Sequence, residues 1–361
     1  MARRHTRRSA IQSILSATGA GAAALTLDGL LGGCTKSQGP HLNFYNWDTY
    51  IGDTTLADFK AASGIDVHMS LFANNDELFA KLRGGNQGYD VIVPSNDFVE
   101  RMRDADMLLP LDHARIPNFR NISPAFRDVP FDPKRAYSMP YTWLVLGIGY
   151  RKSVYPGFVP DSWKWVLDSD KYKGRIGIFG EAGDLFRLVF KYLGLPLNSK
   201  DPAAINRAAD LLIKQKPNIL LFHDDDGQSL LEAGDIDIVI EYNGDVAQVM
   251  REDHDLNFVV PREGSEITSD CLCIPKGARN PALAHQFINF LLDAKVGAAI
   301  TSTIRYPTPN AAAAALMPEE YRLDPVIFPP PAILAKCEYA HYLGEDFAHM
   351  VEDAMTRVRA A

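Results

Sequence analysis

Several carboxylate side chains stand where a predicted strand or helix begins or ends. Glu181 and Asp184 are three residues apart, Asp245 follows the apolar run Ile236 to Glu241, and Asp270 opens another apolar run. An ammonium group is costly to remove from water unless a carboxylate and hydrogen-bond acceptors meet it, so such carboxylates suit a small organic cation. Each also has a structural interpretation, as a helix-terminal acid, a surface turn or a solvated strand end. Residue type alone does not decide between cation binding and these structural roles.

Aromatic residues would supply the other half of such a site, because their faces attract cations and pack against methylene chains. Trp47 and Tyr50 lie beyond the end of a predicted strand rather than within a helical stripe. Tyr306, in a proline-rich segment, could instead anchor a rigid turn. Trp163 and Trp165 are interpreted as packing residues.

Motifs of catalysis and metal binding are missing from the sequence. It contains no Gly-x-Ser-x-Gly elbow, His-Glu-x-x-His helix, phosphate-binding loop or dinucleotide fingerprint. The acids of segment 223–227 lack the alternate spacing of a calcium loop, so we interpret it as an acidic loop. Cys271 and Cys273 lack further metal ligands at matching spacing and are interpreted as buried, while a bridge to Cys337 stays open. We predict no enzyme, cofactor or metal.

The N-terminus has the layout of a signal peptide. An uncharged segment, Ile11 to Leu27, follows four arginines, Arg3, Arg4, Arg7 and Arg8. The ending Leu31-Gly32-Gly33-Cys34 resembles a lipobox, in which the cysteine receives a lipid. The segment Thr6 to Ile11 looks like a twin-arginine export motif, although Ala10 departs from it, so the export route stays open. We predict a signal peptide at 1–33, lipidation of Cys34, a tether at 34–40, and location in the periplasm or cell envelope.

The chain has 361 residues and a formal charge of −8, which becomes −11 without residues 1–33 and their four arginines and one aspartate. An acidic body without a basic stripe argues against nucleic acid, because nothing neutralises phosphates. It slightly favours a cationic ligand. We expect a monomer held at a membrane by its N-terminal lipid.

The elements that must position these residues alternate from His41 onward between short apolar strands and amphipathic helices, which predicts an α/β fold. The first series comprises strands 42–47, 65–72 and 89–95 and helices 54–62 and 75–82, with Asn75 as a helix N-cap. Ligands gather beyond the carboxyl ends of such strands. This rule places 47–50 and 95–97 at one mouth.

A second α/β series predicts a second lobe. Its strands are 175–179, 236–241 and 257–260 and its helices 184–193 and 203–214, before strand 270–275 and helices 282–292 and 296–303 return to the first lobe. We predict lobe 1 at 41–147 plus about 270–318 and lobe 2 at 148–269 plus about 319–361. The chain would then cross between the lobes more than once, forming a hinge.

Several motifs, in order along the chain, resemble the periplasmic spermidine/putrescine-binding proteins of ABC importers. They are Phe44 to Tyr50, Ser63 to Val67, Tyr89 to Ser95, Phe131 to Pro133, Met139 to Tyr141, Asn289 to Leu292 and Tyr306 to Asn310. The resemblance implies a two-lobed periplasmic-binding-protein type II fold with hinge crossovers. It also implies that the protein captures a polyamine and delivers it to an ABC transporter permease, without catalysis.

The same resemblance implies ligand-binding positions for the aromatic and acidic residues. It places Trp47 and Tyr50 on an aromatic wall, Tyr242 at a tryptophan position, and Ser95 and Tyr306 along the ligand. Amines would meet Glu181 and Asp184, Asp270 near the hinge, and Asp245, the last matching an acid of putrescine receptors.

Two positions depart from the family pattern, since Asp97 and Thr268 stand where the family has aromatic residues. The site would therefore have fewer stacking surfaces and more negative charge, and could admit a shorter or guanidinium-bearing cation. A receptor for another solute, or a sensor reporting occupancy to a membrane protein, stays an alternative.

Overall fold

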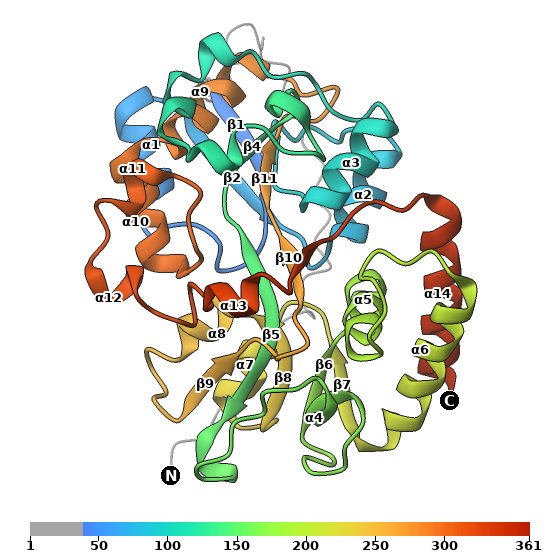
Figure 1. The fold of residues 1–361 in the computed structure, drawn as a ribbon. Helices are drawn as coiled ribbons and strands as arrows, with labels where there is room; N and C mark the ends of the chain where they lie inside the picture. Colours follow the sequence, from blue (N-terminus) through green and yellow to red (C-terminus); the bar gives the residue numbers. More distant parts are fainter. Residues whose placement is uncertain (1–38) are drawn as a thin grey trace, which may run out of the picture. The chain divides into compact units, whose positions relative to one another are not determined.

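The computed structural model describes residues 39–361, which form two α/β lobes, each built around its own sheet (Figure 1). The predicted signal peptide, Cys34 and most of the tether lie outside the described residues. The predicted two-lobed α/β architecture is confirmed.

The first sheet has the strand order β2-β1-β3-β11-β4. Its strands are β1 (His41–Asn46), β2 (Asp66–Leu71), β3 (Val91–Ile92), β4 (Ser138–Pro140) and β11 (Cys271–Cys273). Strand β1 pairs in parallel with β2 and β3, and β11 pairs antiparallel with β3 and β4. The helices of the same region are α1 (Thr55–Ser63), α2 (Asn75–Arg83), α3 (Asn96–Asp104), α9 (Pro281–Leu291), α10 (Ala294–Ile304) and α11 (Ala311–Ala314).

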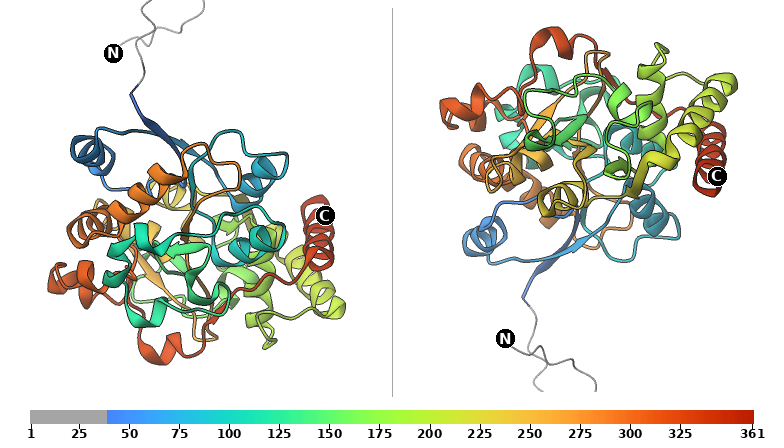
Figure 2. Two further views of the ribbon diagram at one scale, coloured as in Figure 1. Left: turned by 90° about the horizontal axis from the view of Figure 1, so that it is seen from above. Right: turned by 90° about the horizontal axis from the view of Figure 1, so that it is seen from below.

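The second sheet has the order β12-β10-β5-β8-β6-β7, and β9 also pairs with β5. Its strands are β5 (Leu144–Arg151), β6 (Ile176–Phe179), β7 (Ile219–His223), β8 (Ile238–Tyr242), β9 (Leu256–Val259), β10 (Glu266–Thr268) and β12 (Glu338–Tyr339). The remaining helices are α4 (Lys164–Leu167), α5 (Ala182–Tyr192), α6 (Pro202–Gln215), α7 (Gly227–Ala233), α8 (Asn243–Val249), α12 (Glu319–Arg322), α13 (Pro331–Leu334) and α14 (Glu345–Ala360). Helix α14 lies beside α6 at the edge of this lobe (Figure 2).

The chain passes between the two sheets at several points. It enters the second sheet between β4 and β5 and returns between β10 and β11, and both passages are visible in Figure 1. Only Ser269 and Asp270 separate β10 from β11, so Asp270 lies on the return passage and pairs with Ser95 in an isolated bridge. The residue boundaries of the lobes and their hinge motion stay predictions.

Each lobe has an apolar core, as the alternating pattern predicts. In the first lobe Phe287 of α9 packs edge-on against Phe44 and Phe59, with ring centroids 5.2 and 4.9 Å away. In the second lobe Trp163 and Phe186 are fully buried. The interpretation of Trp163 as a packing residue is confirmed.

Helices α9 and α10 together have the length and hydropathy of a candidate membrane span. No single helix within residues 39–361 is long and apolar enough to cross a bilayer, although α9 and α10, bent by 74°, pass that test together. Both contribute buried side chains to the first lobe's core. Cys271, Cys273 and Cys337 are all free thiols.

The predicted N-cap of α2 is wrong by one residue. Asn74, not Asn75, caps the helix, because the Asn74 side chain accepts a hydrogen bond from the Glu77 backbone N–H at 2.8 Å. Asn75 is buried and exchanges two hydrogen bonds with Ser95.

Removing this cap should cost measurable stability. Asn74→Ala is expected to lower the free energy of unfolding by about 1 kcal/mol, because an N–H of the first turn loses its partner. Urea denaturation followed by circular dichroism measures it. Lys81→Ala, at an exposed position of the same helix, should change stability by less than about 0.5 kcal/mol. Equal effects of the two substitutions would show that Asn74 is not the cap.

Candidate ligand-binding site

A narrow slot lies between the lobes, beyond the strand ends of both sheets. Its volume is about 30 Å³, room for about one water molecule. Its walls come from the first sheet and the crossover segments on one side and from β6, β8 and the starts of α5 and α8 on the other. The lining residues are Trp47, Asp48, Tyr50, Ser95, Leu144, Phe179, Glu181, Asp225, Tyr242, Asp245, Asp270 and Tyr306. Eight of these are among the ten ligand-binding positions predicted from the sequence.

Asp270 is the carboxylate of the slot whose role in cation binding is best supported. It is 4% exposed and accepts hydrogen bonds of 2.8 Å from both the Tyr50 and the Ser95 hydroxyl groups. Ser95 in turn is held by Asn75. Burial raises the pKa of Asp270 to about 6, against the lowering effect of these two hydrogen bonds. A carboxylate so positioned gains from any cation that enters.

Asp245 and Asp225 face the slot from the second lobe. Asp245 lies in the first turn of α8, is 5% exposed and accepts a 2.5 Å hydrogen bond from the Tyr306 hydroxyl. Burial raises its pKa to about 7. Asp225 precedes α7. Its pKa is raised to about 9, mainly by burial and to a smaller extent by the negative charge of Asp245. The three carboxyls thus oppose one another's ionisation, which a bound cation would relieve.

Aromatic rings fix the walls of the slot. The Trp47 indole N–H donates to the Val93 carbonyl at 2.8 Å. Tyr50 meets Tyr306 edge to face, with centroids 5.0 Å apart. On the opposite wall Tyr242 lies edge-on to Phe179, which comes from the end of β6. These rings present apolar faces and edges between the acidic positions.

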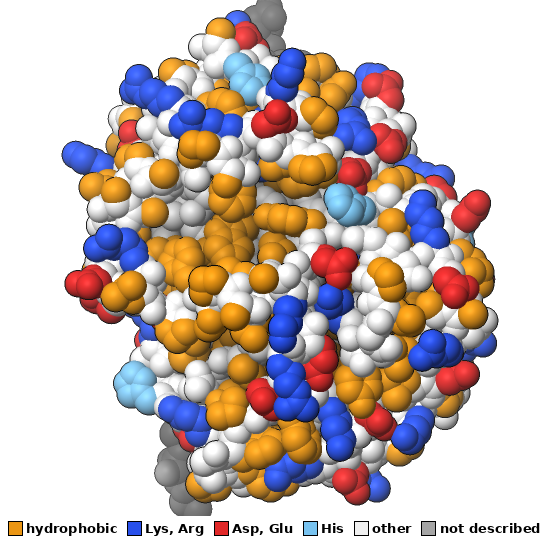
Figure 3. Space-filling model, viewed as in Figure 1, with side chains coloured by type: hydrophobic (Ala, Val, Ile, Leu, Met, Phe, Trp, Pro, Cys, Tyr) orange, Lys and Arg blue, Asp and Glu red, His pale blue; other side chains and the backbone are white. Residues whose placement is uncertain are grey.

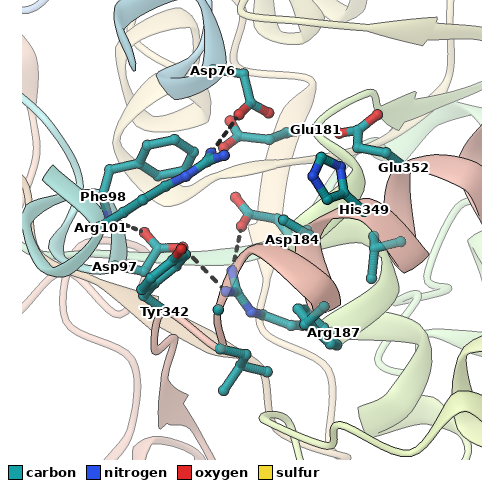
Figure 4. A pocket seen from close by; sticks show the side chains of 16 residues that line it. Asp76, Asp97, Phe98, Arg101, Glu181, Asp184, Arg187, Tyr342, His349 and Glu352 are labelled. Carbon is teal, nitrogen blue, oxygen red and sulfur yellow. Dashed lines mark hydrogen bonds and ion pairs between the residues drawn. The ribbon is translucent and has the colours of Figure 1, made fainter. Parts of the chain in front are cut away.

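Asp97 and Asp184, the two remaining predicted positions, do not line the slot. Both carboxylates bind the Arg187 guanidinium, Asp97 at 3.1 Å and Asp184 at 3.0 Å. They border a neighbouring cavity of about 340 Å³ between α3, α5 and α14 (Figure 4). Glu181 borders both spaces, and the Tyr242 hydroxyl donates to Asp184 at 2.9 Å.

Sequence reasoning missed four lining residues, Asp48, Leu144, Phe179 and Asp225. Asp225 belongs to segment 223–227, which is interpreted above as an acidic loop, and this loop follows β7, whose carboxyl end lies at the same edge as that of β6. Asp48 and Phe179 also stand at or just past strand ends. The rule that ligands gather there already places Asp48 within the predicted mouth at 47–50, and it applies equally to Phe179 and Asp225.

Segment 223–227 runs from the end of β7 into the start of α7. His223 is buried, and its ring Nε2 lies 3.1 Å from the Ile240 carbonyl. In the part of the chain from 39 to 361, no three His, Cys, Asp or Glu side chains are grouped to hold a metal ion.

On the face drawn in Figure 3, acidic and basic side chains are interspersed.

Two α/β lobes that meet over an acidic, aromatic-walled slot define a solute-binding protein of the periplasmic-binding-protein type. The family model described as bacterial extracellular solute-binding protein matches residues 54–329. The chain belongs to this family.

The chain is also similar to individual named proteins. The chain is 33% identical over 313 residues to spermidine/putrescine-binding periplasmic protein 1 of Haemophilus influenzae, covering 86% of this chain and 87% of that protein. It is 34% identical over 322 residues to the putrescine-binding periplasmic protein PotF of Escherichia coli, covering 84% and 87%. The solved structure of the Tp0655 (TpPotD) lipoprotein of Treponema pallidum matches with a TM-score of 0.76 and 28% identity, covering 89% of this chain and all of that one. The family and these relatives are solute-binding proteins, not enzymes.

Proposed function

We propose that this protein captures a small diamine or polyamine outside the cytoplasm and delivers it to the permease of an ABC transporter. The observation that carries the proposal is the placement of Asp270 and Asp245 across a slot walled by Trp47, Tyr50 and Tyr242. In the part of the chain that the structure describes, no Lys or Arg lines this slot. The polyamine names of the relatives support the same ligand class.

Binding would use the slot's charges and rings together. One ammonium group would replace the proton that burial favours on Asp270 or Asp245, so the desolvation cost is offset by a charge-assisted hydrogen bond. The aromatic rings would cover the methylene chain and attract the adjacent positive charge. Because the slot is too small for such a molecule in this conformation, the lobes would part to admit it.

Calorimetric titration of residues 35–361 with putrescine, spermidine, cadaverine and agmatine tests the proposal. We expect saturable 1:1 binding of at least one of these amines, with a dissociation constant below about 10 µM, corresponding to about −7 kcal/mol. Absence of binding to all four would overturn it. The amine should also be recovered chemically unchanged after incubation, since we propose binding without catalysis.

Gly244 offers a test of the aromatic wall. A Cβ at this position would lie 2.4 Å from ring atoms of Tyr306, so Gly244→Ala must displace the ring whose hydroxyl binds Asp245. We expect the affinity for putrescine to fall about 3- to 10-fold, the loss of one hydrogen bond of about 1 kcal/mol. Gly84→Ala is the control, because its backbone has a φ of −77° and no atom lies within 4 Å of an added Cβ there. An unchanged affinity in Gly244→Ala would show that the position of the Tyr306 ring does not affect putrescine binding.

We also propose that the chain is exported and anchored by a lipid on Cys34, with residues 34–40 as tether. The lipobox-like ending supports this, and one structural relative is named a lipoprotein. Cys34→Ala should move the protein from the membrane fraction to the soluble envelope fraction, and equal fractionation of both forms would contradict the anchor. Size-exclusion chromatography with light scattering should give a monomer.

A further inference from the structure

Arg187 is a cation built into the acidic end of the interlobe region. It comes from α5 and is 4% exposed. Its guanidinium donates to Asp97 of α3, to Asp184 one turn earlier and to Glu266 at 3.5 Å. It also donates to the His341 carbonyl at 3.1 Å. The arrangement of Asp97, Arg187 and Asp184 is drawn in Figure 4.

This cluster begins where the slot ends. The Tyr242 ring lines the slot while its hydroxyl binds Asp184, which Arg187 holds. A ligand chain that extended beyond Tyr242 would therefore meet a guanidinium and carboxylates already paired with it. Glu181 is the exception, because its side chain lines the slot and forms no hydrogen bond or ion pair with another side chain of residues 39–361.

The two ends of the region therefore differ in what they offer a cation. At the Asp270 end, Asp48, Asp225 and Asp245 line the slot without a basic partner from the described residues. At the other end, Asp97, Asp184 and Glu266 are paired with Arg187, and among the acids of this end that the structure describes only Glu181 lines the slot. A third ammonium group there would have to share these carboxylates with a guanidinium of like charge that already binds them, so it would gain less than at a carboxylate without a basic partner.

We infer that Arg187 sets the length and charge of the ligand, so that the slot takes a primary diamine in preference to a triamine. One ammonium group would bind the carboxylates around Asp270 and the other Glu181, while the guanidinium fills the place that a further ammonium group would need. This inference rests on the proposed function, since it assumes that amines bind in the slot. It makes Arg187 a specificity-determining residue that never contacts the preferred ligand.

The experiment compares putrescine and spermidine by calorimetric titration. The native protein should bind putrescine at least 10-fold more tightly than spermidine. Arg187→Gln uncovers Asp97 and Asp184 and should raise the affinity for spermidine relative to putrescine at least 10-fold. Arg187→Lys keeps the charge and should retain the native preference. Equal affinities in the native protein, or an unchanged ratio in folded Arg187→Gln, would overturn the inference. If Arg187→Gln does not fold, Arg187→Met, which also removes the charge, takes its place, and an unchanged ratio in that variant would overturn the inference.

A control separates specificity from lobe closure, since Arg187 also links α3 to α5. Arg101 of α3 makes a similar link, a two-bond ion pair of 2.9 Å with Glu345 of α14, and its other ion-pair partner is Asp76 rather than Asp97 or Asp184. Arg101→Gln should change both affinities by the same factor. A change in the putrescine-to-spermidine ratio in this variant would assign the effect to closure instead. Failure of every amine to bind would contradict the proposed function itself, whereas binding without the predicted ratio contradicts only the role of Arg187.

Discussion

Replacing Asp270 by asparagine is expected to weaken putrescine binding at least about 30-fold, a loss of about 2 kcal/mol. Removing one partner of a buried, hydrogen-bonded charge pair costs about 2 kcal/mol or more, because the other charge stays desolvated without compensation. Asparagine has the same shape as aspartate. Its amide oxygen can accept from one of the two hydroxyls, Tyr50 or Ser95, while its NH2 group can donate to the oxygen of the other. The substitution therefore removes the charge with little change of shape.

Calorimetry on the purified variant measures this loss, with thermal unfolding to confirm that it folds. Asp66→Asn is the matched control, because Asp66 is a solvent-exposed acid paired with Lys60 on the same lobe. Its affinity should stay within about twofold, since exposed ion pairs contribute little. If Asp270→Asn bound putrescine as tightly as the native protein, the ammonium would not lie at this carboxylate.

The affinity for putrescine should rise roughly 10²- to 10³-fold between pH 5 and pH 8. The cation binds the ionised carboxylates, while burial holds the pKa of Asp270 at about 6 and that of Asp245 at about 7 in the ligand-free protein. At pH 5 binding must expel protons from both groups, and at pH 8 it need not. The amines stay protonated throughout, as alkyl ammonium groups have pKa values near 10.

Equilibrium dialysis with labelled putrescine across this range gives the profile. The stability of the ligand-free protein should move the opposite way. A carboxyl whose pKa is raised on folding stabilises the fold below its unfolded pKa, near 3.9 for aspartate, and loses that contribution as the pH rises through the folded pKa. Asp270→Asn should show a shallower affinity profile, because one titrating group is gone. A flat native profile would mean that these carboxyls do not meet the ligand.

Strand-end reasoning predicted much of the slot. Trp47, Ser95 and Tyr242 follow or end strands whose apolar patterns are readable, and parallel strands bring such residues to one edge. The same logic, applied to the acidic loop after β7, would have added Asp225. Asn74 escaped because two adjacent asparagines satisfy the same capping pattern, and only the second is needed to hold Ser95.

The role of Arg187 could not be predicted in the same way. Its spacing to Asp184 is visible as a helical pair, but its contact with Asp97 joins residues 90 positions apart. Only the meeting of the two lobes brings Asp97 of α3 to Arg187 of α5, and no local pattern encodes that. As a result, Asp97 looked like an added ligand acid, whereas the structure shows that its charge is paired with an internal cation.

The placement of acids on both sides of the slot has a consequence for how the protein chooses among abundant solutes. Asp270 belongs to the crossover beside the first sheet and Asp245 to the second lobe, and each raises the other's cost of ionisation. A sodium or potassium ion would neutralise the carboxylate on one side of the slot and leave the carboxylate on the other side without a counterion. A neutral molecule of the same length would satisfy neither. Only a flexible dication can pair with the carboxylates on both sides of the slot at once. Closure of the lobes would therefore select a ligand with two positive charges at this separation. Amines at low concentration could then be bound in the presence of abundant monovalent salt, without close contact to every atom of the ligand.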